Sequence, residues 1–146
     1  SASPAVTRRS RRAWIVLIAL LAVETIAGVI ALMPLALGFF EAGDDLFGQR
    51  VSVLLAGLLA VVWVAVTFLG ALRSRASWAR GSALTLHVLL FAAGTGILQY
   101  GLAPSWVGWT AVIAAFVGFF AALLARPEYV APLDEEDGAE EDGGED

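Results

Sequence analysis

Four long runs of apolar residues, separated by short polar stretches, dominate the chain. They lie at about residues 14–37, 51–72, 80–101 and 105–125. Each is close to the roughly 20 residues that a helix needs to cross about 30 Å of hydrocarbon at 1.5 Å per residue. The second and fourth runs contain no charged residue and are apolar on every side, as is typical of a helix in lipid. The pattern predicts an all-α membrane protein in which residues 14–126 form a bundle of four transmembrane helices.

The placement of arginine predicts how these helices are oriented. Four Arg precede residue 13, the stretch RSRASWAR at residues 73–80 carries three, and Arg126 closes the fourth run. The other two connections together carry only Arg50. Basic residues are enriched in cytoplasmic connections, so eight Arg on one side against one on the other predict that both termini are cytoplasmic. We expect a multi-pass protein of a bacterial plasma membrane, with a basic cytoplasmic segment at residues 1–13.

Composition predicts an acidic C-terminal segment and indicates the kind of genome that encodes the chain. Apolar residues make up 59% of the 146 residues and charged residues 16%, against a usual charged fraction of about 25%. Ten of the fourteen acidic residues follow Arg126, so residues 127–146 are expected to form a disordered acidic cytoplasmic tail. Lys and Asn are absent while Ala, Gly, Val, Leu and Arg are abundant, which indicates a high-GC genome such as that of an actinobacterium.

The sequence offers no constellation typical of an enzyme. It contains no Cys, which excludes disulfides, thiolate metal sites and cysteine nucleophiles. No nucleophile has a base nearby, and there is neither a Gly-rich phosphate loop nor a cofactor-binding motif. The acidic residues of the tail lack the ordered ligand spacing of a calcium loop. We therefore expect no enzymatic activity, no cofactor and no metal site.

Two ionisable residues interrupt the apolar runs. Glu24 lies ten residues after Trp14, about 15 Å along the helix and close to the bilayer midplane, where a charge costs roughly 2.5–3.5 kcal/mol on insertion scales. His87 lies nine residues after Trp78, so the two depths agree within about 1.5 Å if both Trp mark the same interface. We therefore predict that Glu24 and His87 pair with each other, either as a structural contact or as a proton-coupling site. A basic residue of a partner protein is the alternative for Glu24.

Rows of small residues predict where helices approach one another. Ala27, Gly28 and Ala31 share the face of Glu24, which indicates that the carboxylate points into the bundle. Similar rows occur on the third and fourth runs. The remaining helix-contact candidates are Ala92, Gly96, Ala114, Gly118 and Ala122. Such rows serve either internal packing or docking on a partner.

The stretch LAVETIAG, which contains Glu24, resembles the first helix of small multidrug resistance transporters. That resemblance covers about eight residues and implies a four-helix protein that works as a dimer, with Glu24 as the proton- or substrate-coupling residue and Trp63 as an aromatic wall. This chain departs from the family in its long acidic tail and in its third helix. A second resemblance covers more of the chain: the basic head, the first helix containing Glu, the Arg-rich second connection and the Gly-rich third helix resemble small uncharacterised four-helix membrane proteins of actinobacteria, which implies a fold and a location but no activity.

These observations predict a non-enzymatic integral membrane protein that is an accessory or interaction subunit of a larger bacterial membrane complex. The alternative is a small oligomeric proton-coupled transporter or channel that uses Glu24. The expected partners are the lipid bilayer and either other membrane subunits or further copies of the chain, and no nucleic acid is expected.

Overall fold

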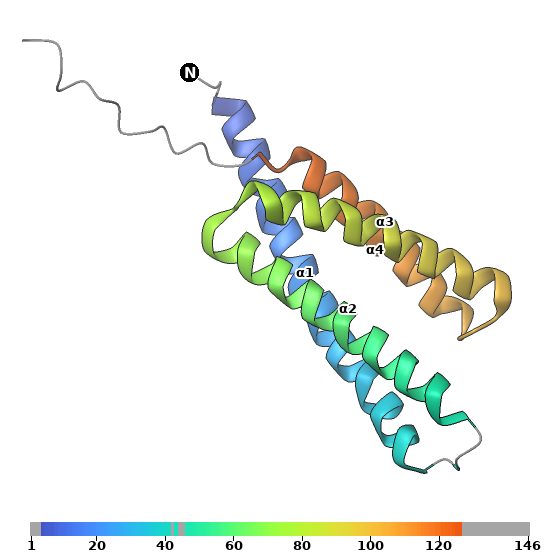
Figure 1. Ribbon diagram of the computed structural model, residues 1–146. Helices are drawn as coiled ribbons and strands as arrows, with labels where there is room; N and C mark the ends of the chain where they lie inside the picture. Colours follow the sequence, from blue (N-terminus) through green and yellow to red (C-terminus); the bar gives the residue numbers. More distant parts are fainter. Residues whose placement is uncertain (1–3, 42, 44–45, 127–146) are drawn as a thin grey trace, which may run out of the picture.

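The computed structural model describes residues 4–41, 43 and 46–126, and these form four helices (Figure 1). The helices are α1 (Pro4–Glu41), α2 (Phe47–Ser74), α3 (Ser77–Tyr100) and α4 (Ser105–Leu124). All four are long and apolar enough to cross a membrane. This confirms the prediction of an all-α protein with four candidate membrane spans. The predicted tail at residues 127–146 lies outside the described residues.

Helix α1 is longer than the apolar run that predicted it. It begins at Pro4, so most of the basic segment expected at residues 1–13 is helical and continuous with the span. Proline is well tolerated in the first turn of a helix, and Ala and Arg, which follow it, are good helix formers. The helix also continues through Pro34 to Glu41, although Pro34 has no N–H to donate to the preceding turn.

Short connections turn the chain back twice at α2–α3 and α3–α4. Arg75, with φ of 45°, adopts the left-handed conformation at the end of α2. Gly101, with φ of 61°, does the same at the end of α3, where its N–H donates to the carbonyl of Ile97 at 3.0 Å. Pro104 then precedes α4. These tight turns produce antiparallel neighbours.

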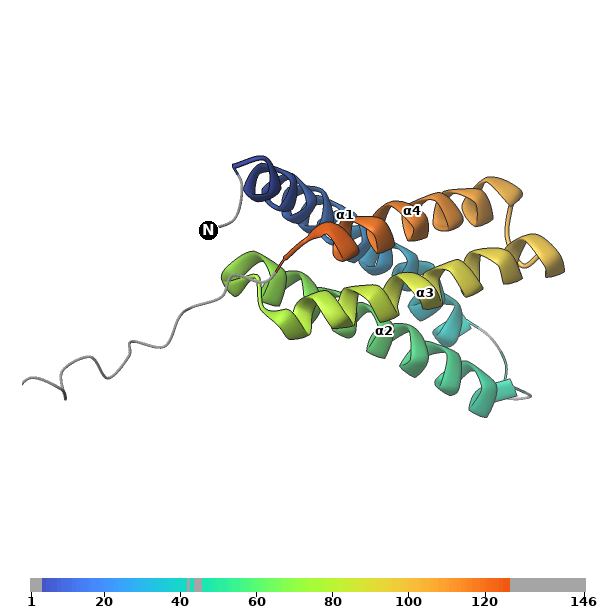
Figure 2. The ribbon, with the colours of Figure 1, turned by 90° about the horizontal axis from the view of Figure 1, so that it is seen from above.

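The helices form two hairpins that touch at one end and diverge towards the other (Figures 1 and 2). One hairpin is α1 with α2, and the other is α3 with α4, which pack together most extensively. The first turns of α1, the α2–α3 connection and the last turn of α4 meet at one end, which we call the arginine-rich end. The α1–α2 and α3–α4 connections lie at the opposite end, where the hairpins are separated.

The apolar core lies near the arginine-rich end. It combines large side chains of α1 with alanines of the other helices, whose small size allows close approach. The core residues are Ala13, Trp14, Leu17, Leu21, Ala71, Ala79, Ala83, Ala121, Ala122 and Ala125. On α1 the last of them is Leu21, and on α2 the only buried residues are Thr67 and Ala71. Contact among all four helices is therefore restricted to this half of the molecule.

Polar contacts tie α4 to α1 and α3 at the arginine-rich end. The Trp14 indole donates to the carbonyl of Arg126 at 2.6 Å, and the N–H of Arg126 donates to Ser10 Oγ at 2.9 Å. Arg80 of α3 donates to the carbonyls of Ala122 and Leu123 at 2.9 and 3.1 Å. The last carbonyls of a helix lack intrahelical partners and carry partial negative charge, so a guanidinium there is favourable.

Candidate functional site

Glu24 of α1 and His87 of α3 face each other where the two hairpins separate. Glu24 Oε1 lies 3.2 Å from His87 Nε2. The imidazole is fully buried and the Glu24 side chain is 16% exposed. Neither facing atom has another hydrogen-bond partner among the described residues, and their own angles fall short of hydrogen-bond geometry. The two groups therefore depend on each other for compensation.

The second nitrogen of His87 is bound within its own helix. His87 Nδ1 lies 2.6 Å from the carbonyl oxygen of Ala83, one turn earlier on α3. A carbonyl only accepts, so Nδ1 carries a proton. Nε2 is then the nitrogen that faces the Glu24 carboxyl, and the two groups form a polar contact between α1 and α3 in an otherwise apolar surrounding.

Helix α4 also contacts this site, because Gly118 packs directly against the His87 ring. A Cβ at this position would overlap His87 Nε2, Cδ2 and Cε1, so only glycine lets α4 approach the ring this closely. Gly118 is itself buried. Three helices thus converge at one level: α1 supplies the carboxylate, α3 the imidazole and α4 the space that the imidazole occupies.

This level also marks the limit of four-helix packing. Leu21 is fully buried one turn before Glu24, whereas Ala27 and Ala31, which follow Glu24 on the same face of α1, are exposed. These two alanines are helix-contact candidates, and they are not buried in a contact between helices of the described chain. The two hairpins diverge away from the arginine-rich end (Figure 1), and this face of α1 is left uncovered. Gly28 does meet another helix, since a Cβ there would lie 2.9 Å from Val61 Cγ2 of α2.

The small-residue row predicted on α3 is displaced in the structure. Ala92 is exposed, and a Cβ on Gly96 would have no neighbour within 4 Å, so neither forms a helix contact. The close approach is made by Gly94, where a Cβ would lie 3.0 Å from the carbonyl oxygen of Gly108 on α4. Gly94 lies seven residues after His87 and so shares its face of the helix. Once the face of α3 that carries His87 is known to be buried, the seven-residue spacing identifies Gly94 as a residue of that buried face.

Two of the three small residues of the α4 row are buried. Ala122 is fully buried in the core and Gly118 is buried against His87. Ala114 is partly buried. Its neighbour Ala115 is 2% exposed and faces inward instead. The small-residue row of α4 is therefore buried near the arginine-rich end and becomes more exposed towards the opposite end of the molecule.

A second polar cluster, which the sequence patterns did not indicate, joins α2 to α3. The Trp63 indole donates to Ser82 Oγ at 2.7 Å, and Ser82 Oγ lies 2.7 Å from Thr67 Oγ1. Thr67 is fully buried and its hydroxyl also donates to the carbonyl of Trp63 at 2.9 Å. Trp63 is thereby engaged by a hydrogen bond across the hairpins. Its mid-span position in the sequence marked it as unusual but did not identify Ser82.

The four candidate spans indicate a multi-pass membrane protein, and the Glu24–His87 pair is its most distinctive chemical feature. No protein-family model, no curated protein and no solved structure matches this chain. The function is accordingly argued from the geometry alone.

Proposed function

We propose that this chain is a non-enzymatic integral protein of a bacterial plasma membrane, with both termini cytoplasmic, that serves as an accessory or interaction subunit of a larger membrane assembly. The observation that carries the proposal is the uncovered small-residue face of α1, Ala27 and Ala31, beside the separated hairpins. Small residues gain little from contact with lipid tails, but they let another helix pack closely. A helix of a partner protein is the natural cover for this face.

The Glu24–His87 pair supports the same role by holding the two hairpins in a defined arrangement. The pair links α1 to α3 at the last level where the hairpins touch, and Gly118 admits α4 to the same junction. Because each group compensates the other within the chain, the carboxylate does not need a basic residue of the partner. The partner is instead recognised by the shape of the small-residue face.

Helix geometry provides a matched pair of probe positions on α1. At 3.6 residues per turn, Ala31 lies about 20° around the helix from Glu24, whereas Met33 lies about 180° away. Met33 is 63% exposed. Ala31 therefore samples the proposed docking face, and Met33 samples the opposite face at nearly the same depth.

The test is photo-crosslinking in the native membrane, with a benzophenone amino acid replacing either Ala31 or Met33. The proposal predicts a discrete crosslink to a different polypeptide from position 31 and only lipid adducts from position 33. Lipid adducts alone from both positions would contradict the proposal. A crosslink from position 31 to a second copy of the chain would contradict a heteromeric subunit and favour the alternative below.

The alternative function is a small oligomeric proton-coupled transporter or channel. The specific observation in its favour is that two ionisable side chains face each other within the candidate spans, with Glu24 Oε1 3.2 Å from His87 Nε2. Ionisable groups at such positions often mark proton pathways. A transport role predicts that Glu24→Gln abolishes proton flux in vesicles while the bundle stays folded. A structural role predicts that Gln largely replaces Glu24, and the bundle's stability and crosslinks are retained.

A further inference from the structure

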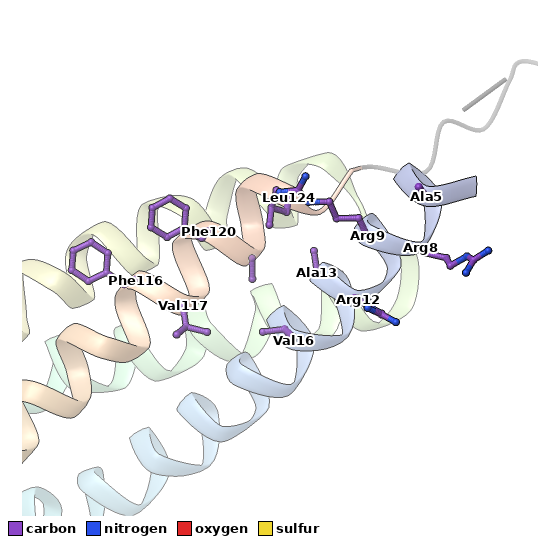
Figure 3. A pocket seen from close by; sticks show the side chains of 11 residues that line it. Ala5, Arg8, Arg9, Arg12, Ala13, Val16, Phe116, Val117, Phe120 and Leu124 are labelled. Atoms are coloured by element: carbon purple, nitrogen blue, oxygen red, sulfur yellow. The ribbon is translucent and has the colours of Figure 1, made fainter. Parts of the chain in front are cut away.

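A groove of about 1030 Å³ lies between the first turns of α1 and the second half of α4 (Figure 3). Its two ends differ in chemistry. Arg8, Arg9 and Arg12 line it at the arginine-rich end, and side chains that include Phe116 and Phe120 line it towards the membrane interior. The groove does not include the Glu24–His87 pair.

The basic end of the groove lacks an acidic counterpart in the described part of the chain. The only carboxylates there are Glu24, which faces His87, and Glu41, at the far end of α1. In Figure 3, Arg9 extends towards Leu124 at the end of α4, and the heads of Arg8 and Arg12 extend outward from α1. These three Arg lie within little more than one helical turn and have long side chains, so a phosphate at this end of the groove can draw their guanidinium groups together through the paired hydrogen bonds that Arg forms with phosphate.

The apolar part of the groove is continuous with an aromatic stack on α3 and α4. The rings of Phe116 and Phe120 are stacked with centroids 6.4 Å apart, and Phe91 meets Phe116 edge to face at 5.4 Å. Arg8 and Val16, both of which line the groove, are eight residues or about 12 Å apart along α1. With the arginine-rich end at the membrane surface, a groove of this length runs from the depth of the lipid phosphates into the region of the acyl chains.

We propose that this groove binds an anionic phospholipid, with the phosphate among Arg8, Arg9 and Arg12 and an acyl chain along Phe116 and Phe120. The negatively charged phosphate then meets the basic end of the groove, and the apolar acyl chain meets its aromatic part. A free phosphate would leave the aromatic wall bare, and an acidic peptide would place charge against it. Basic pockets between helices at the cytoplasmic side commonly bind anionic headgroups. The lipid site goes beyond the subunit role and does not depend on it.

The test measures lipid binding to the full-length protein in a neutral detergent by native mass spectrometry. Phosphatidylglycerol and phosphatidylcholine with identical acyl chains are titrated separately. Arg9→Gln/Arg12→Gln removes two charges from the groove, and Arg11→Gln/Arg73→Gln removes two exposed charges from the same end without touching it. At about fivefold per arginine, the groove variant is expected to bind phosphatidylglycerol about 25-fold more weakly, and the control less than threefold.

A second experiment distinguishes binding of a whole lipid from binding of its phosphate alone. Phe116→Ala/Phe120→Ala is expected to weaken binding of phosphatidylglycerol with long acyl chains and to leave weak binding of inorganic phosphate unchanged. Equal binding of both lipids, or equal losses in the two arginine variants, would overturn the proposal. Phosphatidylglycerol binding that appears only after deletion of residues 134–146 would assign the groove to the chain's own acidic segment and overturn it as well.

Discussion

Gly118→Ala tests whether the meeting of three helices at the Glu24–His87 pair controls stability. The new Cβ would overlap the His87 ring, and an ordinary carbon contact is about 3.5–4.0 Å, so the separation between ring and α4 has to grow by more than about 1 Å. The ring cannot simply rotate away, because it is 1% exposed and Nδ1 is held by the Ala83 carbonyl. Overpacking of this kind costs about 1–3 kcal/mol.

Displacing the ring also separates Nε2 from Glu24. A polar contact between membrane helices contributes on average about 0.6 kcal/mol, so the expected total loss is about 2–4 kcal/mol of unfolding free energy. The assay is unfolding in dodecylmaltoside micelles with increasing SDS, followed by circular dichroism. Gly96→Ala is the matched control, because a Cβ there meets nothing within 4 Å. Equal stability of Gly118→Ala, Gly96→Ala and the unmodified protein would refute the described packing.

Three further substitutions probe other contacts in the same unfolding assay. His87→Ala leaves the Glu24 carboxyl without its partner and is expected to cost about 3 kcal/mol, clearly more than Glu24→Gln; similar costs would contradict the pairing. Arg80→Gln removes the donors to two last carbonyls of α4 and is expected to cost about 1–2 kcal/mol, with faster hydrogen exchange in that turn; unchanged exchange would count against the cap. Ser82→Ala removes the acceptor of the Trp63 indole and is expected to cost about 1–2 kcal/mol, whereas Ser82→Thr retains the hydroxyl and most of the stability.

Depth along the membrane normal could be predicted from the sequence, because the bilayer dictates how many apolar residues a span requires. The four candidate spans follow from that constraint. Depth also associates Glu24 with His87, since each lies about the same number of residues from a Trp, and the two lie 3.2 Å apart in the structure. The helical state of residues 4–13 was not expected, because hydropathy marks where lipid begins and not where a helix begins.

Rotation and tilt of the helices could not be predicted in the same way. Small residues on α3 occur on more than one face, so the choice of Gly96 instead of Gly94 required knowledge of which face meets α4. The divergence of the hairpins depends on the sum of contacts among α1, α3 and α4. No local pattern reports it, which is why Ala27 and Ala31 were expected in an internal contact. A groove formed by segments more than 100 residues apart, such as the one between Arg9 and Phe120, is equally invisible to a sequence pattern.

The composition of the particle that contains this protein in its native membrane tests the proposed role most directly. The measurement is extraction in mild detergent, followed by determination of the particle's mass and its polypeptides. It is repeated for Ala31→Trp, which blocks the small-residue face of α1, and for Met33→Trp on the opposite face. The proposal predicts a second polypeptide in fixed ratio that is retained with Met33→Trp and lost with Ala31→Trp. A particle made of this chain alone, or one that both substitutions leave intact, would contradict it.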